Sequence, residues 1–489
     1  MNKCGTPSFI LEKKLLTSKD DEEVLGLRFF YAVRIQIQLV KHVRVQIQKL
    51  REDNDYRSLL EERSSVPGED KERTARLNLL LKEKRLEYGL SLYQFKQWTK
   101  PLQHRYRKHL DSRTVQAIAD DAWKAAEAAL FRKGKKLRLP KWHEVRSLES
   151  NDNKTGIKFR GGRIVWNGLE IQLSRDRRNA YENEALLRRV KYCRIVRKPM
   201  GKRWHYYVQL VLEGHPPKKH TIGRGRVGID PGTLSMAAVS EKKCILASLT
   251  EGVKDRAKEV QRIQKAMDRS RRAMNPDRYN PDGTVKRKQG RWKESRSYRL
   301  LAMKKRSLER RQVSCRKNHH EALTNEILSL GDEVYTEQMS YTSLQRRKKK
   351  TTINSKGRFD RKKRFGRSLQ YGAPAMFLSI VDRKLRYEGK ELHKVNTRTF
   401  RASQYNHVTD GYVKKKLSRR HNVIGGKWVQ RDLYSAFLIM NSDAEMEHAD
   451  RALCRDTYDN FLILHDQCIE ELKSGSRELL SSFGISRAA

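Results

Sequence analysis

The sequence predicts a multidomain α+β protein in which a helical N-terminal part, a β-rich segment and a mixed α/β unit follow one another. Its length of 489 residues is enough for two or three domains. The apolar residues recur with helical spacing over roughly residues 20–135, and they alternate with a period of two between residues 157 and 212. From residue 226 onward, short apolar strands and long charged helical stretches succeed one another.

The N-terminal part is predicted to be a basic helical bundle. Residues 27–66 contain neither Gly nor Pro, which predicts one long helix. Residues 33–39 also alternate with a period of two, so a strand is the local alternative, and the length of the stretch favours the helix. A second helical stretch is predicted over residues 72–98. A third follows Asp111 or Ser112, either of which can cap a helix N-terminus.

The middle segment is predicted to be a small β-barrel or sandwich. Short alternating runs are separated by the turn signals Gly161-Gly162, Asn167-Gly168 and Met200-Gly201-Lys202, which are typical of hairpins. Pro216-Pro217 and Gly223 then predict a linker.

The third unit opens with a buried strand over residues 227–229 that ends in Asp230-Pro231-Gly232. Two further strands and a long helical hairpin within residues 252–330 follow, and then a strand that ends at Glu337. Residues 346–367 are basic and poor in apolar side chains, which predicts a loop. A helix, a strand, an irregular segment over residues 396–430, a helix that opens at Arg431 and an acidic helical tail complete the chain.

The composition restricts the class of protein. The chain has 107 Lys and Arg against 58 Asp and Glu, a net charge of +49, which implies a polyanionic partner, with nucleic acid the first candidate. No apolar run is long enough for a membrane span, and the N-terminus lacks the apolar core of a secretion signal. The six cysteines are scattered without a CxxC pair. They therefore predict a cytoplasmic protein without a disulfide framework or Cys-type zinc site.

Three acids are candidates for chemistry, because each lies at the edge of an apolar element. Asp230 and Glu337 each end a predicted strand, and Asp432 lies where an irregular stretch becomes a helix. Taken singly, each has a structural alternative: Asp432 can be an N-cap and Glu337 a solvated strand end. Taken together in so basic a chain, they match the acid set of a nuclease in which three carboxylates hold a pair of Mg²⁺ ions for phosphodiester hydrolysis.

Four segments carry a family resemblance. They are VGIDPGTLSMAAVS, RKNHHEALTNEILSLGDEVYTEQMSYTSLQ, RFGRSLQYGAPAMFLSIVDRKL and VQRDLYSAFLI. In this order they closely resemble the RuvC motifs of the TnpB proteins of IS200/IS605-type transposons and of the compact type V CRISPR effectors descended from them. A weaker likeness to the end of that family's recognition lobe begins near residue 110, and together the matches cover most of residues 110–440.

The resemblance implies a helical recognition domain (21–135) inserted in an OB-like β-barrel wedge domain (1–20 and 136–220). An RNase H-like (RuvC) α/β nuclease domain then runs over residues 221–395, with a helical hairpin at 253–330 and a basic loop at 346–367. Residues 396–430 would be a cysteine-less, ribbon-like segment that binds target nucleic acid, and residues 431–489 the end of the nuclease domain with a helical tail.

The resemblance also implies an activity. Asp230, Glu337 and Asp432 become the catalytic and Mg²⁺-binding triad, with Mn²⁺ able to substitute. The chain would be a prokaryotic, cytoplasmic, monomeric ribonucleoprotein that associates with the nucleoid when bound to DNA. It would use a guide RNA to cleave double-stranded DNA beside a short adjacent motif. Two alternatives share this fold: a nuclease-inactive, RNA-guided repressor, which the three intact acids disfavour, and an RNase H-fold transposase, which the RDLYSAF motif disfavours.

Nucleic-acid contacts are expected from two basic clusters. They comprise Arg269, Arg271, Arg272, Lys286, Arg287 and Lys288 in the helical hairpin, and Arg346, Arg347, Lys348, Lys349 and Lys350 in the basic loop. Relatives in the family usually carry a four-cysteine zinc ribbon before the third motif, but residues 396–430 contain no cysteine. His393, His407 and His421 lack zinc-site spacing. We therefore expect no structural zinc there, and apolar contacts of Phe400, Tyr405, Val408, Tyr412, Val423 and Trp428 in its place.

Overall fold

The computed structural model divides the chain into two compact units, Met1–Pro217 (unit 1) and Lys218–Ala489 (unit 2). The structure describes residues 6–67, 70–131, 137–201, 203–218, 220–281, 283–286, 290–347, 365–416, 418–475, 477 and 479–486. Within these ranges no helix has the length and apolarity needed to cross a membrane.

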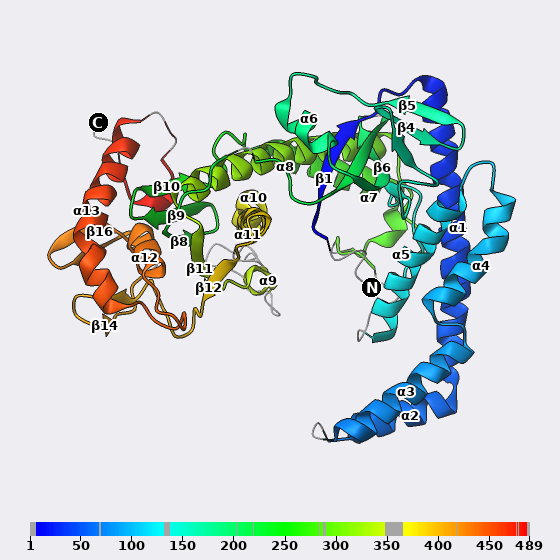
Figure 1. Ribbon diagram of the computed structural model, residues 1–489, viewed down its shortest axis with the longest axis horizontal. Coiled ribbons are helices and arrows are strands. Elements are labelled where there is room, and N and C mark those ends of the chain that lie inside the picture. Colours follow the sequence, from blue (N-terminus) through cyan, green and yellow to red (C-terminus); the bar gives the residue numbers. More distant parts are fainter. Residues whose placement is uncertain are drawn as a thin grey trace. The chain divides into compact units, whose positions relative to one another are not determined.

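Unit 1 combines a helical stretch with two antiparallel sheets (Figure 1). Its elements are, in chain order, β1 (Ser8–Lys14), α1 (Lys19–Glu52), α2 (Asn54–Ser65), α3 (Lys71–Glu87), α4 (Leu92–Arg105), α5 (Ser112–Phe131), β2 (Ser147–Glu149), β3 (Lys158–Arg160), β4 (Arg163–Trp166), β5 (Leu169–Gln172), α6 (Ala180–Leu186), β6 (Val190–Met200) and β7 (Arg203–Glu213).

The helices of unit 1 begin and end at side-chain caps. Ser18 and Asp21 form a capping box at the start of α1. The single helix predicted over residues 27–66 is wrong, because Asp53 adopts an extended backbone and its carboxylate accepts a hydrogen bond from the Tyr56 amide, which starts α2. The stretch predicted over residues 72–98 is likewise two helices, α3 and α4, separated near Gly89 with its φ of 69°.

The strands of unit 1 form a four-stranded sheet of order β1-β7-β6-β2 and a three-stranded sheet of order β3-β4-β5. The predicted hairpin turns are confirmed where the backbone reverses, with positive φ at Gly161, Gly162, Gly168 and Gly201. Strand β1 pairs along its full length with residues 207–213 of β7. Helices α1 to α5 therefore lie in the chain between two strands of one sheet, and that sheet packs against the first half of α1.

Unit 2 is built around one five-stranded sheet. Its elements are β8 (Arg226–Pro231), β9 (Ser235–Ser240), β10 (Cys244–Ser248), α7 (Ala257–Met274), the 3-10 helix η1 (Pro276–Arg278), α8 (Arg296–Leu330), β11 (Glu333–Glu337), α9 (Tyr341–Leu344), α10 (Gly366–Gly372), α11 (Pro374–Tyr387), β12 (Leu392–Val395), β13 (Tyr405–Asn406), β14 (Gly411–Tyr412), β15 (His421–Ile424), β16 (Lys427–Gln430), α12 (Arg431–Met440), α13 (Arg451–Ser474) and the 3-10 helix η2 (Ser481–Phe483).

The sheet has the strand order β10-β9-β8-β11-β12. Strands β10, β9 and β8 are mutually antiparallel, whereas β8, β11 and β12 run parallel. Alternate side chains divide between two cores. Val227 and Ile229 pack with α8 and α11, whereas Ala237 and Tyr335 pack with α12 and α13. Figure 1 shows α12 and α13 on one side of these strands and α8 and α11 on the other.

Candidate nuclease site

Two of the predicted acids end neighbouring parallel strands. Strands β8 and β11 pair in a register that sets Ile229 opposite Thr336. Asp230 and Glu337 each follow one residue later, and adjacent strands lie about 4.8 Å apart. Because side chains at opposite positions of a sheet share a face, both carboxyl groups belong to the face that α12 covers.

The third acid is brought to this face by the packing of α12 on β8. A β carbon built at Gly228 would stand 2.1 Å from the Ala436 carbonyl oxygen and 2.4 Å from the Met440 amide nitrogen. Only glycine therefore allows the helix to lie so close to the strand. The Arg226 guanidinium donates to the Met440 carbonyl at 3.4 Å, so the end of α12 lies at the start of β8. Asp432, about one helical turn before Ala436, is therefore displaced toward the end of the strand that carries Asp230.

The start of α12 is fixed by its own side chains. The Gln430 side-chain oxygen accepts a hydrogen bond from the Leu433 amide at 2.7 Å, which caps the helix. Gln430, not Asp432, is thus the N-cap, and the structural alternative for Asp432 is not realised. The Asp432 carboxylate pairs instead with the Arg431 guanidinium at 3.2 Å.

Electrostatics connect the three acids. Burial raises the pKa of Asp230 well above its usual value, and the negative charges of Glu337 and Asp432 raise it further, whereas Arg431 lowers it. Burial also raises the pKa of Glu337. The charges of Glu337 and Asp432 therefore disfavour the ionised form of Asp230, and a bound cation would relieve this effect.

The donor chemistry of this neighbourhood fits Mg²⁺, a hard cation that prefers carboxylate oxygen. Within the described residues, however, no three His, Cys, Asp or Glu side chains converge tightly enough to form a ligand set. The structure thus brings the predicted acids to the C-terminal ends of β8 and β11, but their carboxyl groups are not close enough together to ligate one cation.

Tyr341 is a residue of this site that the sequence analysis missed. The chain turns sharply after β11, where the Met339 amide donates to the Glu337 carbonyl oxygen at 3.0 Å. Helix α9 then begins at Tyr341, whose hydroxyl is buried without a hydrogen-bond partner in the described structure. Burial and the charges of Asp230 and Glu337 raise the pKa of Tyr341. No residue pattern in the sequence indicates that the Tyr341 hydroxyl is buried near two carboxyl groups.

The predicted nucleic-acid contacts differ in their surroundings. Arg269, Arg272, Lys286, Arg346 and Arg347 are exposed. Arg272 nevertheless donates to the Gly283 carbonyl at 3.2 Å, and so it also fastens the loop of the helical hairpin.

Arg271 is half-buried. It donates to the Tyr298 hydroxyl, and its guanidinium lies over the Tyr298 and Trp292 rings at 4.9 and 5.3 Å. Arg287, Lys288 and Lys348 to Lys350 lie outside the described residues.

The apolar contacts expected to hold residues 396–430 are confirmed in part. Phe400 and Tyr405 are buried, and the ring of the partly exposed Tyr412 lies 4.9 Å from the Tyr405 ring. Val408, Val423 and Trp428 are exposed, and for these three the prediction is wrong. Ile424 and Val429 join the core in their place.

The three histidines considered for zinc lie in separate contacts. His407 bonds the Tyr434 hydroxyl at 2.8 Å, His393 stacks on Tyr335, and His421 stacks on Trp428.

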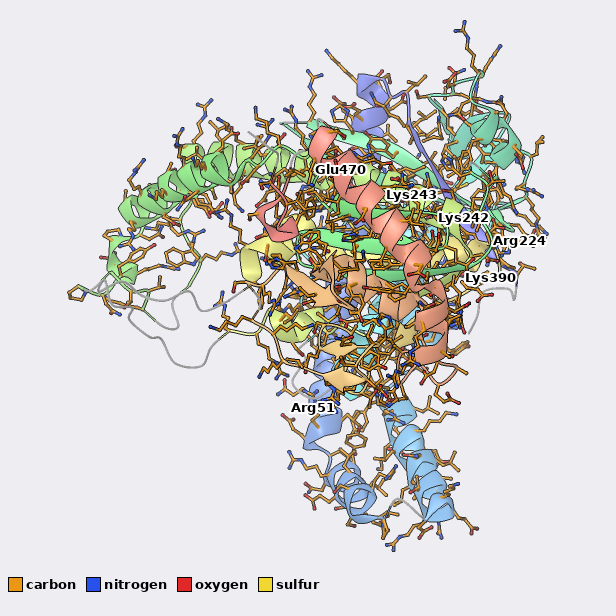
Figure 2. The ribbon with its side chains drawn as sticks, turned by 90° about the vertical axis from the view of Figure 1, so that its left-hand side faces the viewer. Arg51, Arg224, Lys242, Lys243, Lys390 and Glu470 are labelled. Carbon is orange, nitrogen blue, oxygen red and sulfur yellow. The ribbon has the colours of Figure 1, made fainter. Side chains whose placement is uncertain are left out.

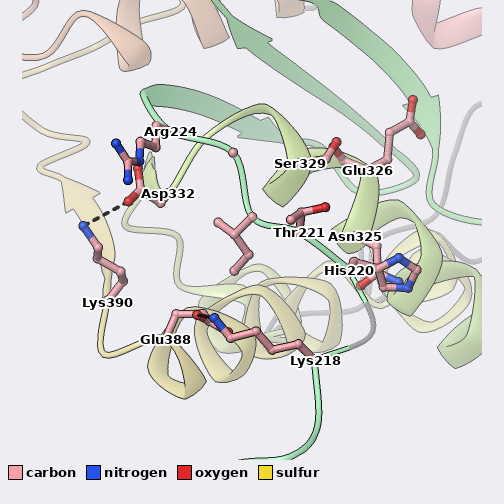
Figure 3. A pocket seen from close by; sticks show the side chains of 12 residues that line it. Lys218, His220, Thr221, Arg224, Asn325, Glu326, Ser329, Asp332, Glu388 and Lys390 are labelled. Carbon is pink, nitrogen blue, oxygen red and sulfur yellow. Dashed lines mark hydrogen bonds and ion pairs between the residues drawn. The ribbon is translucent and has the colours of Figure 1, made fainter. Parts of the chain in front are cut away.

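A cavity of unit 2 lies at the opposite end of the parallel strands. It measures about 870 Å³, and Arg224, Asp332 and Lys390, which line it, precede the parallel strands β8, β11 and β12. Its charges are largely paired, Lys390 with Asp332 at 3.0 Å and Lys218 with Glu388 at 2.8 Å (Figure 3). Figure 2 shows Arg224 and Lys390 on this side of the unit with Lys242 and Lys243. None of the residues that line the cavity is one of the three acids, so the cavity is not part of the candidate nuclease site.

No protein-family model and no curated protein matches the chain. Solved structures do show similarity. A Cas12f1–sgRNA–target DNA complex has a TM-score of 0.43 and 11% identity over 89% of this chain and 99% of that one. A CRISPR-Cas12f ternary complex has a TM-score of 0.24 and 11% identity over 85% and 82%. A Cas12i–crRNA–dsDNA complex has a TM-score of 0.27 and 11% identity over 96% and 66%. These likenesses concern the fold alone.

Proposed function

We propose that the chain is an RNA-guided DNA endonuclease that cleaves double-stranded DNA beside a short adjacent motif. Hydrolysis would take place at a single Mg²⁺-dependent site formed by Asp230, Glu337 and Asp432. The sheet of unit 2 would be an RNase H-like nuclease domain, and the sheets of unit 1 an OB-like wedge. The observation that carries the proposal is the register of β8 and β11 together with the close packing of α12 on Gly228.

The chain's own residues have distinct parts in this chemistry. Asp230 and Glu337 would hold the cation from adjacent strand ends, and Asp432 from the first turn of α12. A divalent ion bound there would supply Lewis-acid stabilisation of the phosphate and lower the pKa of an attacking water. Arg431, paired with Asp432, would orient that carboxylate and add positive charge near the scissile phosphate.

The nucleic-acid part of the proposal rests on charge and motif. A net charge of +49 suits a protein that holds a duplex by its phosphates. The guide RNA follows from the ordered motif resemblance, since base pairing would then read the target sequence and the protein only its backbone and the adjacent motif. We propose no structural zinc for residues 396–430.

The test is to express the chain with its native flanking DNA, sequence the RNA that co-purifies, and assay cleavage of DNA matched to that RNA. The proposal predicts one defined RNA and metal-dependent double-strand cleavage that EDTA stops and Mg²⁺ restores. A defined RNA with target binding but no cleavage would indicate the repressor, and strand-joining products would indicate a transposase. The absence of any defined RNA would contradict guidance altogether.

A further inference from the structure

The hairpin of β15 and β16 presents an apolar face to solvent. Val423 and Trp428 lie opposite one another in the hairpin register, and they are 56% and 42% exposed. The other face of the same hairpin is buried through Ile424 and Val429. Val423 and Trp428 therefore form a small exposed apolar surface on an ordered strand pair.

The exposed Trp is held on a rigid support. The Tyr458 hydroxyl donates to the Ile424 carbonyl at 3.0 Å, and the Gln430 amide donates to His465 at 2.9 Å. These bonds from α13 fix both strands of the hairpin. The His421 ring lies nearly parallel to the Trp428 ring, at 28° and 5.8 Å between centroids, and the buried His465 ring of α13 lies 5.7 Å from the Trp428 ring. Trp428 remains 42% exposed.

The surroundings of this surface are strongly basic. Burial lowers the pKa of Lys415, and repulsion from Arg419 and Arg431 lowers it further. These three cations therefore lie close together. The Arg419 side chain also donates to the His421 carbonyl at 3.2 Å, which places it beside the aromatic pair. Arg431 already pairs with Asp432, so Lys415 and Arg419 are the cations that an incoming phosphate would meet.

The surface is also next to the candidate nuclease site along the chain. Strand β16 ends at Gln430 and α12 begins at Arg431. Trp428 is therefore separated from Asp432 by at most about 14 Å of extended backbone, a span of a few nucleotides.

We propose that Trp428, supported by His421, is a stacking platform for an unpaired nucleobase of the strand that enters the Asp230–Glu337–Asp432 site. The combination of an exposed aromatic face with flanking cations fits single-stranded nucleic acid, because unpaired bases offer their faces for stacking while their phosphates meet the cations. Duplex DNA keeps its bases stacked on one another and offers only phosphates and groove edges. The inference rests on the proposed function for the fate of the strand, and it adds one residue, Trp428, that would position that strand.

The test compares binding of two oligonucleotides of equal length and charge, one single-stranded DNA and one composed wholly of abasic sites, to the full chain in EDTA. Stacking of one base is worth roughly 1–3 kcal/mol, so Trp428→Ala should reduce the preference for the base-bearing strand by about 5- to 150-fold. Trp428→Phe should retain most of it. Val313→Ala, which truncates an exposed valine of α8 outside this patch, is the control and should leave the preference unchanged.

A second measurement uses the unaltered protein, so it does not depend on how a variant folds. Single-stranded DNA that carries 5-iododeoxyuridine is irradiated on the full chain, and the cross-linked peptides are identified by mass spectrometry. The proposal predicts a cross-link at Trp428 or His421. An unchanged preference in Trp428→Ala, or cross-links confined to other parts of the chain, would overturn it. Because neither measurement needs a guide or a metal, a protein that stacks the strand but never cleaves it would contradict only the proposed function.

Discussion

Gly228 lies directly beneath the backbone of Ala436, and a β carbon at position 228 would stand 2.1 Å from the Ala436 carbonyl oxygen. Because this oxygen belongs to helix backbone, it cannot move aside without moving α12. The proximity of Gly228 and Ala436 sets the depth at which α12 rests on the sheet, and with it the position of Asp432 over the strand that carries Asp230.

Gly228→Ala should therefore displace α12 and destabilise unit 2 by about 1–3 kcal/mol, the usual cost of overpacking. The thermal unfolding temperature measures the loss of stability and the cleavage rate measures the displacement of α12, and both quantities should fall. Gly26→Ala is the control, since Gly26 has open space around it and Ala is the better helix former. A Gly228→Ala protein as stable and active as the wild type would show that α12 does not depend on this contact.

Tyr341→Phe removes only the buried hydroxyl that lies near Asp230 and Glu337. If this hydroxyl donates to the reacting phosphate or to the attacking water, its loss should slow cleavage by about 100-fold while target binding and thermal stability stay unchanged. Tyr93→Phe, at an exposed tyrosine of unit 1, should have no effect. Equal single-turnover rates for Tyr341→Phe and wild type would assign the hydroxyl no part in the reaction.

Acid should destabilise unit 2 through two buried histidines. Burial lowers the pKa of His320 and of His407 to about 4, whereas an unfolded histidine titrates near about 6.5. Between these values the unfolded chain binds more protons, so the free energy of unfolding must fall as the pH falls, by about 1.4 kcal/mol per pH unit for each residue.

Denaturant unfolding between pH 7 and pH 4 measures this slope. His407→Gln should lower stability at pH 7, because it removes the bond to the Tyr434 hydroxyl, and yet make the slope shallower. An unchanged slope in this variant would mean that His407 is as readily protonated in the folded chain as in the unfolded one.

Neutralising Arg346 and Arg347 should weaken nucleic-acid binding without sequence preference. Each lost phosphate contact lowers the magnitude of the salt slope by about 0.9, so the double Ala variant should lose up to about 1.8. Lys218→Ala is a suitable control because Lys218 already pairs with Glu388 at 2.8 Å. If titrations at several salt concentrations give one slope for all three proteins, Arg346 and Arg347 do not contact phosphate.

The elements that carry the three acids could be predicted from the sequence because their signals are local, whereas the grouping of the acids came from the resemblance. A strand-sized apolar run before Asp230, a second before Glu337 and a helix that opens at Arg431 are all visible in the pattern of residues. The depth of α12 on Gly228 could not be predicted, since it depends on a backbone contact between segments about two hundred residues apart.

The faces of the β15–β16 hairpin show a different limit. Val423 and Trp428 look like core residues, and Asn422 looks like a surface residue, yet the structure buries Asn422 and exposes the other two. The inward face is chosen by Ile424 and Val429, and a shift of one position in a hairpin exchanges the two faces completely. Composition alone cannot decide between them. The burial of the Tyr341 hydroxyl could not be predicted either, because it depends on how the chain turns after Glu337.

The most direct test of the account is the rate at which guide-matched double-stranded DNA is cut by the wild type and by Asp230→Asn, Glu337→Gln and Asp432→Asn, with target binding measured alongside. Asp332→Asn, at the opposite end of the parallel strands, is the control. The account predicts that each of the three substitutions slows cleavage at least about 1,000-fold and leaves target binding nearly unchanged, whereas the control cuts normally. Wild-type cleavage by any one of the three variants would contradict the assignment of that acid to the site.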